Sequence, residues 1–157
     1  MRDAADISSC GQYRYTLRRG LPSANKELKQ ILWVMLNPST ADATNDDPTI
    51  RRCVGFSTAW GFAEMVVVNL YAYRATDPKV LWSIPDPVGP DNDDYIREYA
   101  MCSDMTLCAW GKAGPDRDRA LHVRGLIPNA HYLRMNKSGH PGHPLYLPKE
   151  LTPKEWS

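Results

Sequence analysis

The sequence predicts an α/β protein, a three-layer α/β/α sandwich whose central, mainly parallel sheet has about four core strands. Two observations support this prediction. Short apolar runs, typical of strands buried on both faces, alternate along the chain with segments whose apolar residues recur at helical spacing. Each run is followed by polar, proline or glycine residues, as expected of loops that leave the carboxyl ends of parallel strands. The length of 157 residues suits a single domain over residues 1–157.

The predicted core strands occupy residues 31–36, 65–71, 105–111 and 130–135. The first three are mostly continuous apolar runs, whereas the fourth alternates apolar and polar residues. Residues 13–18 alternate large and charged side chains, so we expect an antiparallel or edge strand there.

Helices are expected between the strands, at residues 48–60, 78–82, 116–124 and from 91 to 100 or 102. The first is the most clearly marked, because Asp47 is a favourable N-cap, Pro48 suits the first turn and Gly61 suits the end. The remaining segments are expected to be a loose arm at 1–11, loops at 20–29 and 84–90, and a short docked helix at 151–156.

Composition indicates a soluble cytoplasmic protein with no membrane partner. Hydrophobic residues make up 43% of the chain and charged residues 24%, and no apolar run reaches membrane-spanning length. The four cysteines form no CxxC pair, as expected of reduced thiols. The formal net charge of +1 argues against extensive sequence-independent binding to a phosphate backbone. Two local basic clusters are either solvated or functional: Arg14, Arg18 and Arg19, and Arg117, Arg119 and Arg124.

The loops after the four core strands are expected to converge on one crevice. They begin with Asn37-Pro38-Ser39, with Asn69-Leu70-Tyr71, with Trp110-Gly111-Lys112 and, after the last strand, with two His-Pro pairs. Two asparagine amides in one cleft could read the edge of a planar base or orient a water molecule. The structural alternative is that these asparagines fix turns and that Asp46 and Asp47 cap a helix.

Several other chemistries are not supported. The chain has no GxxxxGK[ST] or GxGxxG phosphate-binding motif and no GxSxG elbow. His140 and His143 have no cysteine or carboxylate at zinc-like spacing, so we expect neither a metal nor a cofactor.

A set of ordered motifs resembles a bacterial and phage family known only as domain of unknown function 1643. The motifs lie at residues 9–15, 35–42, 46–52, 69–71, 89–92, 109–111 and 142–147. The resemblance covers nearly the whole chain.

A more distant resemblance is to the uracil-DNA glycosylase superfamily, through the order strand-NP, strand-N, strand-WG and HP. It implies that Asn37 orients the attacking water and that Asn69 contacts the base or the first loop. In the resulting hypothesis, Asn37, or Asp46 or Asp47 beside it, positions that water. His143 would then donate to the leaving base, with His140 as a competing candidate. The predicted catalytic residues are Asn37, Asp46, Asp47 and His143. The predicted substrate-binding residues are Pro38, Ser39, Thr40, Asn69, Tyr71, Arg74, Asn92, Trp110, Gly111 and His140.

The function predicted from these features is a glycosylase-like hydrolase that acts on the N-glycosidic bond of a base in nucleic acid or a nucleotide. The expected partner is therefore a nucleic acid, nucleotide or base. The alternative is a non-catalytic base- or nucleotide-binding module of phage or bacterial origin. A third reading, a partner-binding protein, predicts an exposed apolar patch in place of a polar cleft.

Overall fold

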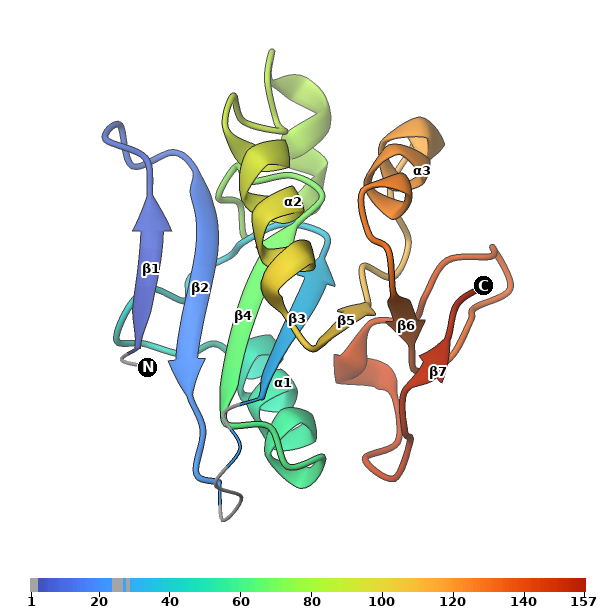
Figure 1. The fold of residues 1–157 in the computed structure, drawn as a ribbon. Coiled ribbons are helices and arrows are strands. Elements are labelled where there is room, and N and C mark those ends of the chain that lie inside the picture. Colours follow the sequence, from blue (N-terminus) through green and yellow to red (C-terminus); the bar gives the residue numbers. More distant parts are fainter. Residues whose placement is uncertain (1–2, 24–26, 28) are drawn as a thin grey trace.

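A mixed β-sheet forms the centre of the computed structural model, which describes residues 3–23, 27 and 29–157. Within these residues the sheet has seven strands in the order β1-β2-β4-β3-β5-β6-β7 (Figure 1). The strands are Ala4–Ile7 (β1), Arg14–Gly20 (β2), Gln30–Met35 (β3), Glu64–Asn69 (β4), Met105–Cys108 (β5), Ala130–Tyr132 (β6) and Lys154–Glu155 (β7).

The four central strands, β4, β3, β5 and β6, run parallel to one another. Strand β2 pairs antiparallel with β4, β1 pairs antiparallel with β2, and β7 pairs antiparallel with β6. The prediction of an α/β protein with a parallel core of four strands is therefore confirmed, as is the antiparallel strand beside it. Because the central strands are parallel, their carboxyl ends lie at one edge of the sheet.

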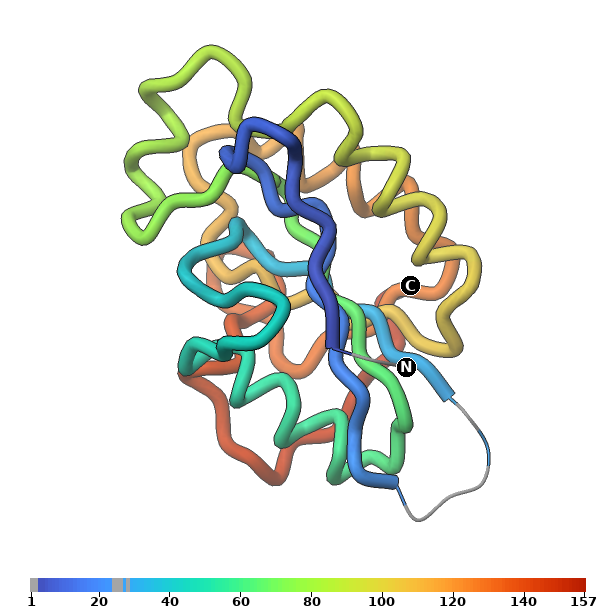
Figure 2. The backbone as a smooth tube through the Cα atoms, turned by 90° about the vertical axis from the view of Figure 1, so that its left-hand side faces the viewer, coloured from blue at the N-terminus to red at the C-terminus, as the bar shows by residue number. Residues whose placement is uncertain are grey.

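Helices cover both faces of the sheet. The α-helices are Pro48–Ala59 (α1), Asn92–Cys102 (α2) and Arg117–Gly125 (α3), and the 3-10 turns are Pro78–Ser83 (η1) and Pro144–Tyr146 (η2). Figure 2, which views the sheet from its β1 edge, shows α1 on one side and α2 on the other. In Figure 1, α2 and α3 lie on the same face.

Alternation along the buried strands explains the two layers of core. In β3, Ile31 and Trp33 pack in the cluster that contains α1, whereas Leu32 and Val34 pack in the cluster that contains α2 and α3. The indole Nε1–H of Trp33 is paired, because it donates to Oγ of Ser57 in α1 at 2.9 Å. Both faces of this strand are thus buried, which is why it appears in the sequence as an uninterrupted apolar run.

Several predicted elements differ from those observed. Residues 4–7, expected in a loose arm, form β1, and the Asp6 carboxylate accepts a hydrogen bond from Thr16 Oγ1 at 2.5 Å. Residues 154–155 form β7 where a short helix was expected, and the N–H of Trp156 donates to the Ala130 carbonyl at 2.9 Å. Strand β6 ends at Tyr132, earlier than predicted. The expected loop at 20–29 lies partly outside the described residues.

No helix in the described part of the chain is both long enough and apolar enough to cross a membrane.

Candidate functional site

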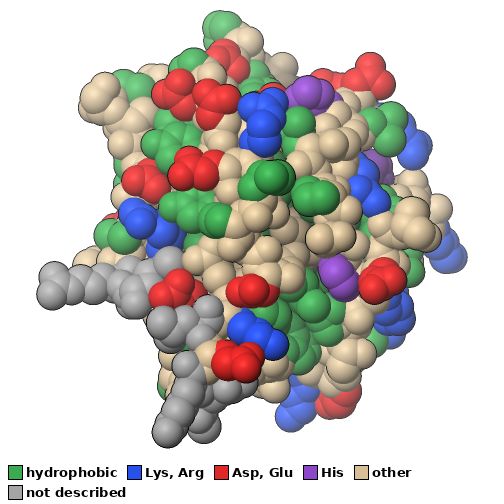
Figure 3. Space-filling model, viewed as in Figure 1, with side chains coloured by type: hydrophobic (Ala, Val, Ile, Leu, Met, Phe, Trp, Pro, Cys, Tyr) green, Lys and Arg blue, Asp and Glu red, His purple; other side chains and the backbone are tan. Residues whose placement is uncertain are grey.

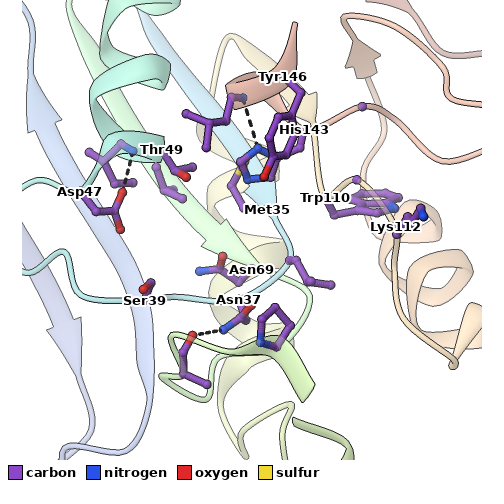
Figure 4. Close-up of a pocket in the computed structure, with 18 of the residues that line it drawn as sticks. Met35, Asn37, Ser39, Asp47, Thr49, Asn69, Trp110, Lys112, His143 and Tyr146 are labelled. Carbon is purple, nitrogen blue, oxygen red and sulfur yellow. Dashed lines mark hydrogen bonds between the residues drawn. The ribbon is translucent and has the colours of Figure 1, made fainter. Parts of the chain in front are cut away.

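A cavity of about 660 Å³ lies where the central parallel strands end. Its walls come from the ends of β3 and β4, the loops that follow β3, β4 and β5, the first turn of α1, and the segment around η2 (Figure 4). This volume is in the range of small-molecule sites in proteins. The predicted site residues that line it are Asn37, Ser39, Asp47, Asn69, Trp110, Gly111 and His143. The expected convergence of the loops is therefore found.

Asn69 is the last residue of β4, and its side chain has no hydrogen-bond partner among the described residues. Only 1% of the residue is exposed, and both amide atoms, Oδ1 and Nδ2, are buried and unpaired. Buried amide groups in native proteins are nearly always paired with protein, water or a ligand. Because Asn69 lines the cavity, a molecule in the cavity can supply both missing partners.

Asn92, predicted to bind substrate, lies behind this site and does not line the cavity. Its Nδ2 donates to the main-chain carbonyls of Asn69 at 2.9 Å and Leu70 at 3.2 Å. Nε of Arg119 donates to the same Leu70 carbonyl at 2.8 Å, and Nη1 of Arg119 forms an ion pair with Asp93 at 2.7 Å. These bonds satisfy the carbonyls at the end of β4 and hold the backbone of Asn69 in place.

Asn37 links two of the loops around the cavity. Its Nδ2 donates to the Ala75 carbonyl at 2.8 Å and to the Pro38 carbonyl at 3.0 Å. No donor in the described part of the chain reaches its Oδ1. The amide is therefore held by its donor side, and its acceptor is available to a water molecule or ligand.

The two neighbouring acids, Asp46 and Asp47, differ in placement. Asp47 is the N-cap of α1, where its Oδ1 accepts from the Ile50 N–H at 2.8 Å, and it lines the cavity. Asp46 lies outside the cavity, and its Oδ1 accepts from Nε of the buried Arg19 at 2.8 Å. Of the two candidate acids, only Asp47 is placed to act on a molecule in the cavity.

His143 is held as a neutral hydrogen-bond donor. Its Nδ1 accepts from the Leu145 N–H at 3.2 Å, so that nitrogen carries a lone pair and the ring proton is on Nε2. Burial lowers the pKa of His143 below its usual value, although the charge of Asp47 opposes this shift. The imidazole can therefore donate from Nε2 without being charged.

The two His-Pro pairs both contact the loop after β5, but only one of their histidines lines the cavity. Gly111 has a positive φ of 67°, and its N–H donates to the Pro141 carbonyl at 2.8 Å. A Cβ on Gly111 would lie 3.3 Å from that of His143, so the two loops are in close contact. Nε1 of Trp110 donates to Nδ1 of His140 at 3.3 Å. His143 lines the cavity, whereas His140 lies outside it on the indole of Trp110.

Four other predicted substrate-binding residues also lie outside the cavity. Pro38 is buried, and its carbonyl accepts from Asn37 and from the Ala75 N–H. Tyr71 is buried, and its ring packs edge-on against Trp82. Thr40 and Arg74 do not contribute to the lining either.

Arg14 lines the cavity, although its place in the sequence indicates only that it belongs to a basic cluster. It is in β2, and 2% of it is exposed. The alternation at residues 13–18 indicates a strand with its charged side chains outward, so it gives no signal that Arg14 is buried. Within the described residues, no group of three or more His, Cys, Asp or Glu side chains is placed to hold a metal ion.

Comparison with known proteins identifies a family. The model of a family described as protein of unknown function (DUF1643) matches residues 14–145. Searches of curated proteins and of solved structures found no significant match. The match includes β2 to β6 and reaches into η2, so it contains all the residues that line the cavity except Tyr146 and Leu147. The chain belongs to the DUF1643 family.

Proposed function

We propose that this protein is a hydrolase that cleaves the N-glycosidic bond of a nucleobase in a nucleotide or nucleic acid. The observation that carries the proposal is the unpaired amide of Asn69 in the cavity. A carboxamide presents one donor and one acceptor in a plane, which complements the edge of a base. Because both atoms are buried, a ligand without matching groups would leave them unpaired and be rejected.

The surrounding residues match the needs of the reaction. As the bond from the sugar carbon to the base nitrogen breaks, its electron pair moves onto the base. Nε2–H of His143 donates to an oxygen of that base and stabilises the negative charge. The sugar carbon becomes oxocarbenium-like and is attacked by water, which Asn37 Oδ1 orients. The carboxylate of Asp47 stabilises the cation and accepts the proton from the water. This order of loops is similar to that of the uracil-DNA glycosylase superfamily, and we propose the same three-layer fold type.

The alternative is a module that binds a base or nucleotide in the same cavity without turnover. One contact favours it: Asp47 Oδ1 already accepts from Ile50, so one carboxylate oxygen is occupied as a helix cap.

The test is base release. Nucleosides, nucleotides and oligonucleotides that contain uracil, hypoxanthine or a mismatch are incubated with the protein, and free base is measured by chromatography. We expect Asp47→Asn, which can still cap the helix, to reduce release by about 10²-fold or more, as for loss of a general base. Asp46→Asn is the matched control and should retain release, because Asp46 lies outside the cavity.

The outcomes separate the two candidates. Binding of nucleosides without release by the wild type would favour the binding module. Absence of both binding and release would refute the proposal, as would equal loss of release in the Asp46 and Asp47 variants.

A further inference from the structure

Arg14 is a buried cation whose hydrogen bonds are mostly unmade. Nη1 donates to the Ala41 carbonyl at 2.8 Å, and Nε is buried without a partner among the described residues. Burial lowers the pKa of Arg14 to about 10, so the side chain is still charged at neutral pH. A buried charge that lacks an ion pair is unfavourable unless another molecule completes its coordination.

The contrast with Arg19, on the same strand, shows what Arg14 lacks. Arg19 is similarly buried, but its Nε forms an ion pair with Asp46 at 2.8 Å, and its other nitrogens donate to main-chain carbonyls. No carboxylate in the described chain forms such a pair with Arg14. Arg14 lines the cavity, whereas Arg19 does not.

The charge of the cavity also favours an anion. Its charged lining residues are Arg14 and Lys112, which are positive, and Asp47, which is negative, so they sum to a net +1 with His143 neutral. Asp47 lies within electrostatic reach of both Arg14 and His143, because its charge opposes the fall in pKa of each. The lining thus offers a cation at Arg14, a carboxylate at Asp47, and neutral donors at His143 and Asn69.

We propose that Arg14 binds the terminal phosphate of a mononucleotide whose base reaches Asn69. The substrate class is then a free nucleoside 5′-monophosphate in preference to a base within a DNA duplex. This inference rests on the proposed function for the identity of the base site, but the anion site at Arg14 is argued independently from its own unmade bonds.

Two observations favour a terminal phosphate over an internal one. Arg14 is 2% exposed, so a phosphodiester bound to it would have no open path for the strand on both sides. The formal net charge of +1 also disfavours sequence-independent binding along a nucleic-acid backbone, and acidic and basic side chains are interspersed on the face that carries α2 (Figure 3).

The experiment compares ligands that differ only in the phosphate. Isothermal titration calorimetry measures the binding of deoxyuridine, deoxyinosine and deoxyguanosine, of their 5′-monophosphates, and of a short single-stranded oligonucleotide. We expect at least one monophosphate to bind the wild type about tenfold or more tightly than its nucleoside, as for hydrogen bonds to a charged group. Arg14→Gln should reduce this ratio to near one.

Two further variants serve as controls. Arg97→Gln removes an exposed arginine that pairs with Asp94 on α2, and it should keep the wild-type ratio. Arg14→Lys retains the charge and should keep part of the preference, which tests the site if Arg14→Gln does not fold.

Three results would overturn the inference: equal affinity of the wild type for nucleoside and monophosphate, an unchanged preference in Arg14→Gln, or tighter binding of the oligonucleotide through Arg14. If no nucleoside or monophosphate binds, the proposed function fails, and inorganic phosphate alone tests Arg14. Thermal stabilisation of the wild type but not of Arg14→Gln by phosphate would then support the anion site, and stabilisation of neither would refute it.

Discussion

Replacing Asn69 with leucine should stabilise the fold while it removes base binding. Leucine has the same branched shape and the same number of side-chain heavy atoms as asparagine, and Met35 and Val67 line the same cavity. In the free protein, the two amide atoms of Asn69 are buried and have no protein partner. The substitution therefore removes desolvated polar atoms without breaking a hydrogen bond to the described chain.

The magnitude follows from those two atoms. A buried polar group without a partner costs about 1–3 kcal/mol, and water that enters the cavity can relieve part of this. We therefore expect Asn69→Leu to raise the free energy of unfolding by about 1–2 kcal/mol. For a chain of this length, that corresponds to a rise in Tm of roughly 2–8 °C. Chemical denaturation and thermal melts measure both quantities, and calorimetry measures the loss of nucleoside binding.

Asn92→Leu is the matched control, because Asn92 is equally buried but its Nδ2 donates to two carbonyls. This variant should lose about 2–4 kcal/mol of stability. If Asn69→Leu is also destabilised, the amide of Asn69 is already paired in the free protein. The reasoning that connects it to a base would then be refuted.

Three further predictions concern the parts that hold the site. Burial lowers the pKa of His143 in the folded protein below 6.5. As the pH falls, the imidazole is therefore protonated in the unfolded chain before it is protonated in the folded one. The wild type should then lose stability from a pH of about 6.5 down to the lower pKa of His143 in the folded protein. His143→Gln should flatten that slope in urea denaturation between about pH 5 and 7, and an unchanged slope would contradict it. Gly111→Ala places a Cβ at a positive φ and 3.3 Å from His143, so denaturation should show a loss of about 1–2 kcal/mol together with weaker base binding; wild-type values of both would show that the loop adapts. Ser57→Ala leaves the buried Nε1–H of Trp33 without its acceptor, so denaturation followed by tryptophan fluorescence should show a loss of about 1–3 kcal/mol, and no change would mean that the indole finds another partner.

The parallel core could be predicted because its strands are buried on both faces. A strand such as β3 must be apolar throughout, and the helix α1 is marked by Asp47 and Pro48 at its start. The edge strands β1 and β7 could not be predicted in this way. They have four and two residues, too few to show a strand periodicity, and both residues of β7 are charged, so pairing with a neighbouring strand defines them.

The candidate site was predicted in its location but only partly in its members. Asp46 and Asp47 are adjacent and chemically alike, and the ion pair of Asp46 with Arg19 distinguishes them. Likewise, His140 and His143 each precede a proline. His140 is bonded to the indole of Trp110 outside the cavity, whereas His143 lines the cavity. These distinctions depend on tertiary contacts between distant segments, which local sequence patterns do not contain.

Strand β2 contributes Arg14 to the cavity lining and the N-cap of η2 contributes His143, although most of the chain separates them in sequence. The complete cavity therefore cannot exist on a nascent chain until the His-Pro segment has left the ribosome. A bound ligand would then connect two segments that are distant in the sequence, and should slow the unfolding of both together.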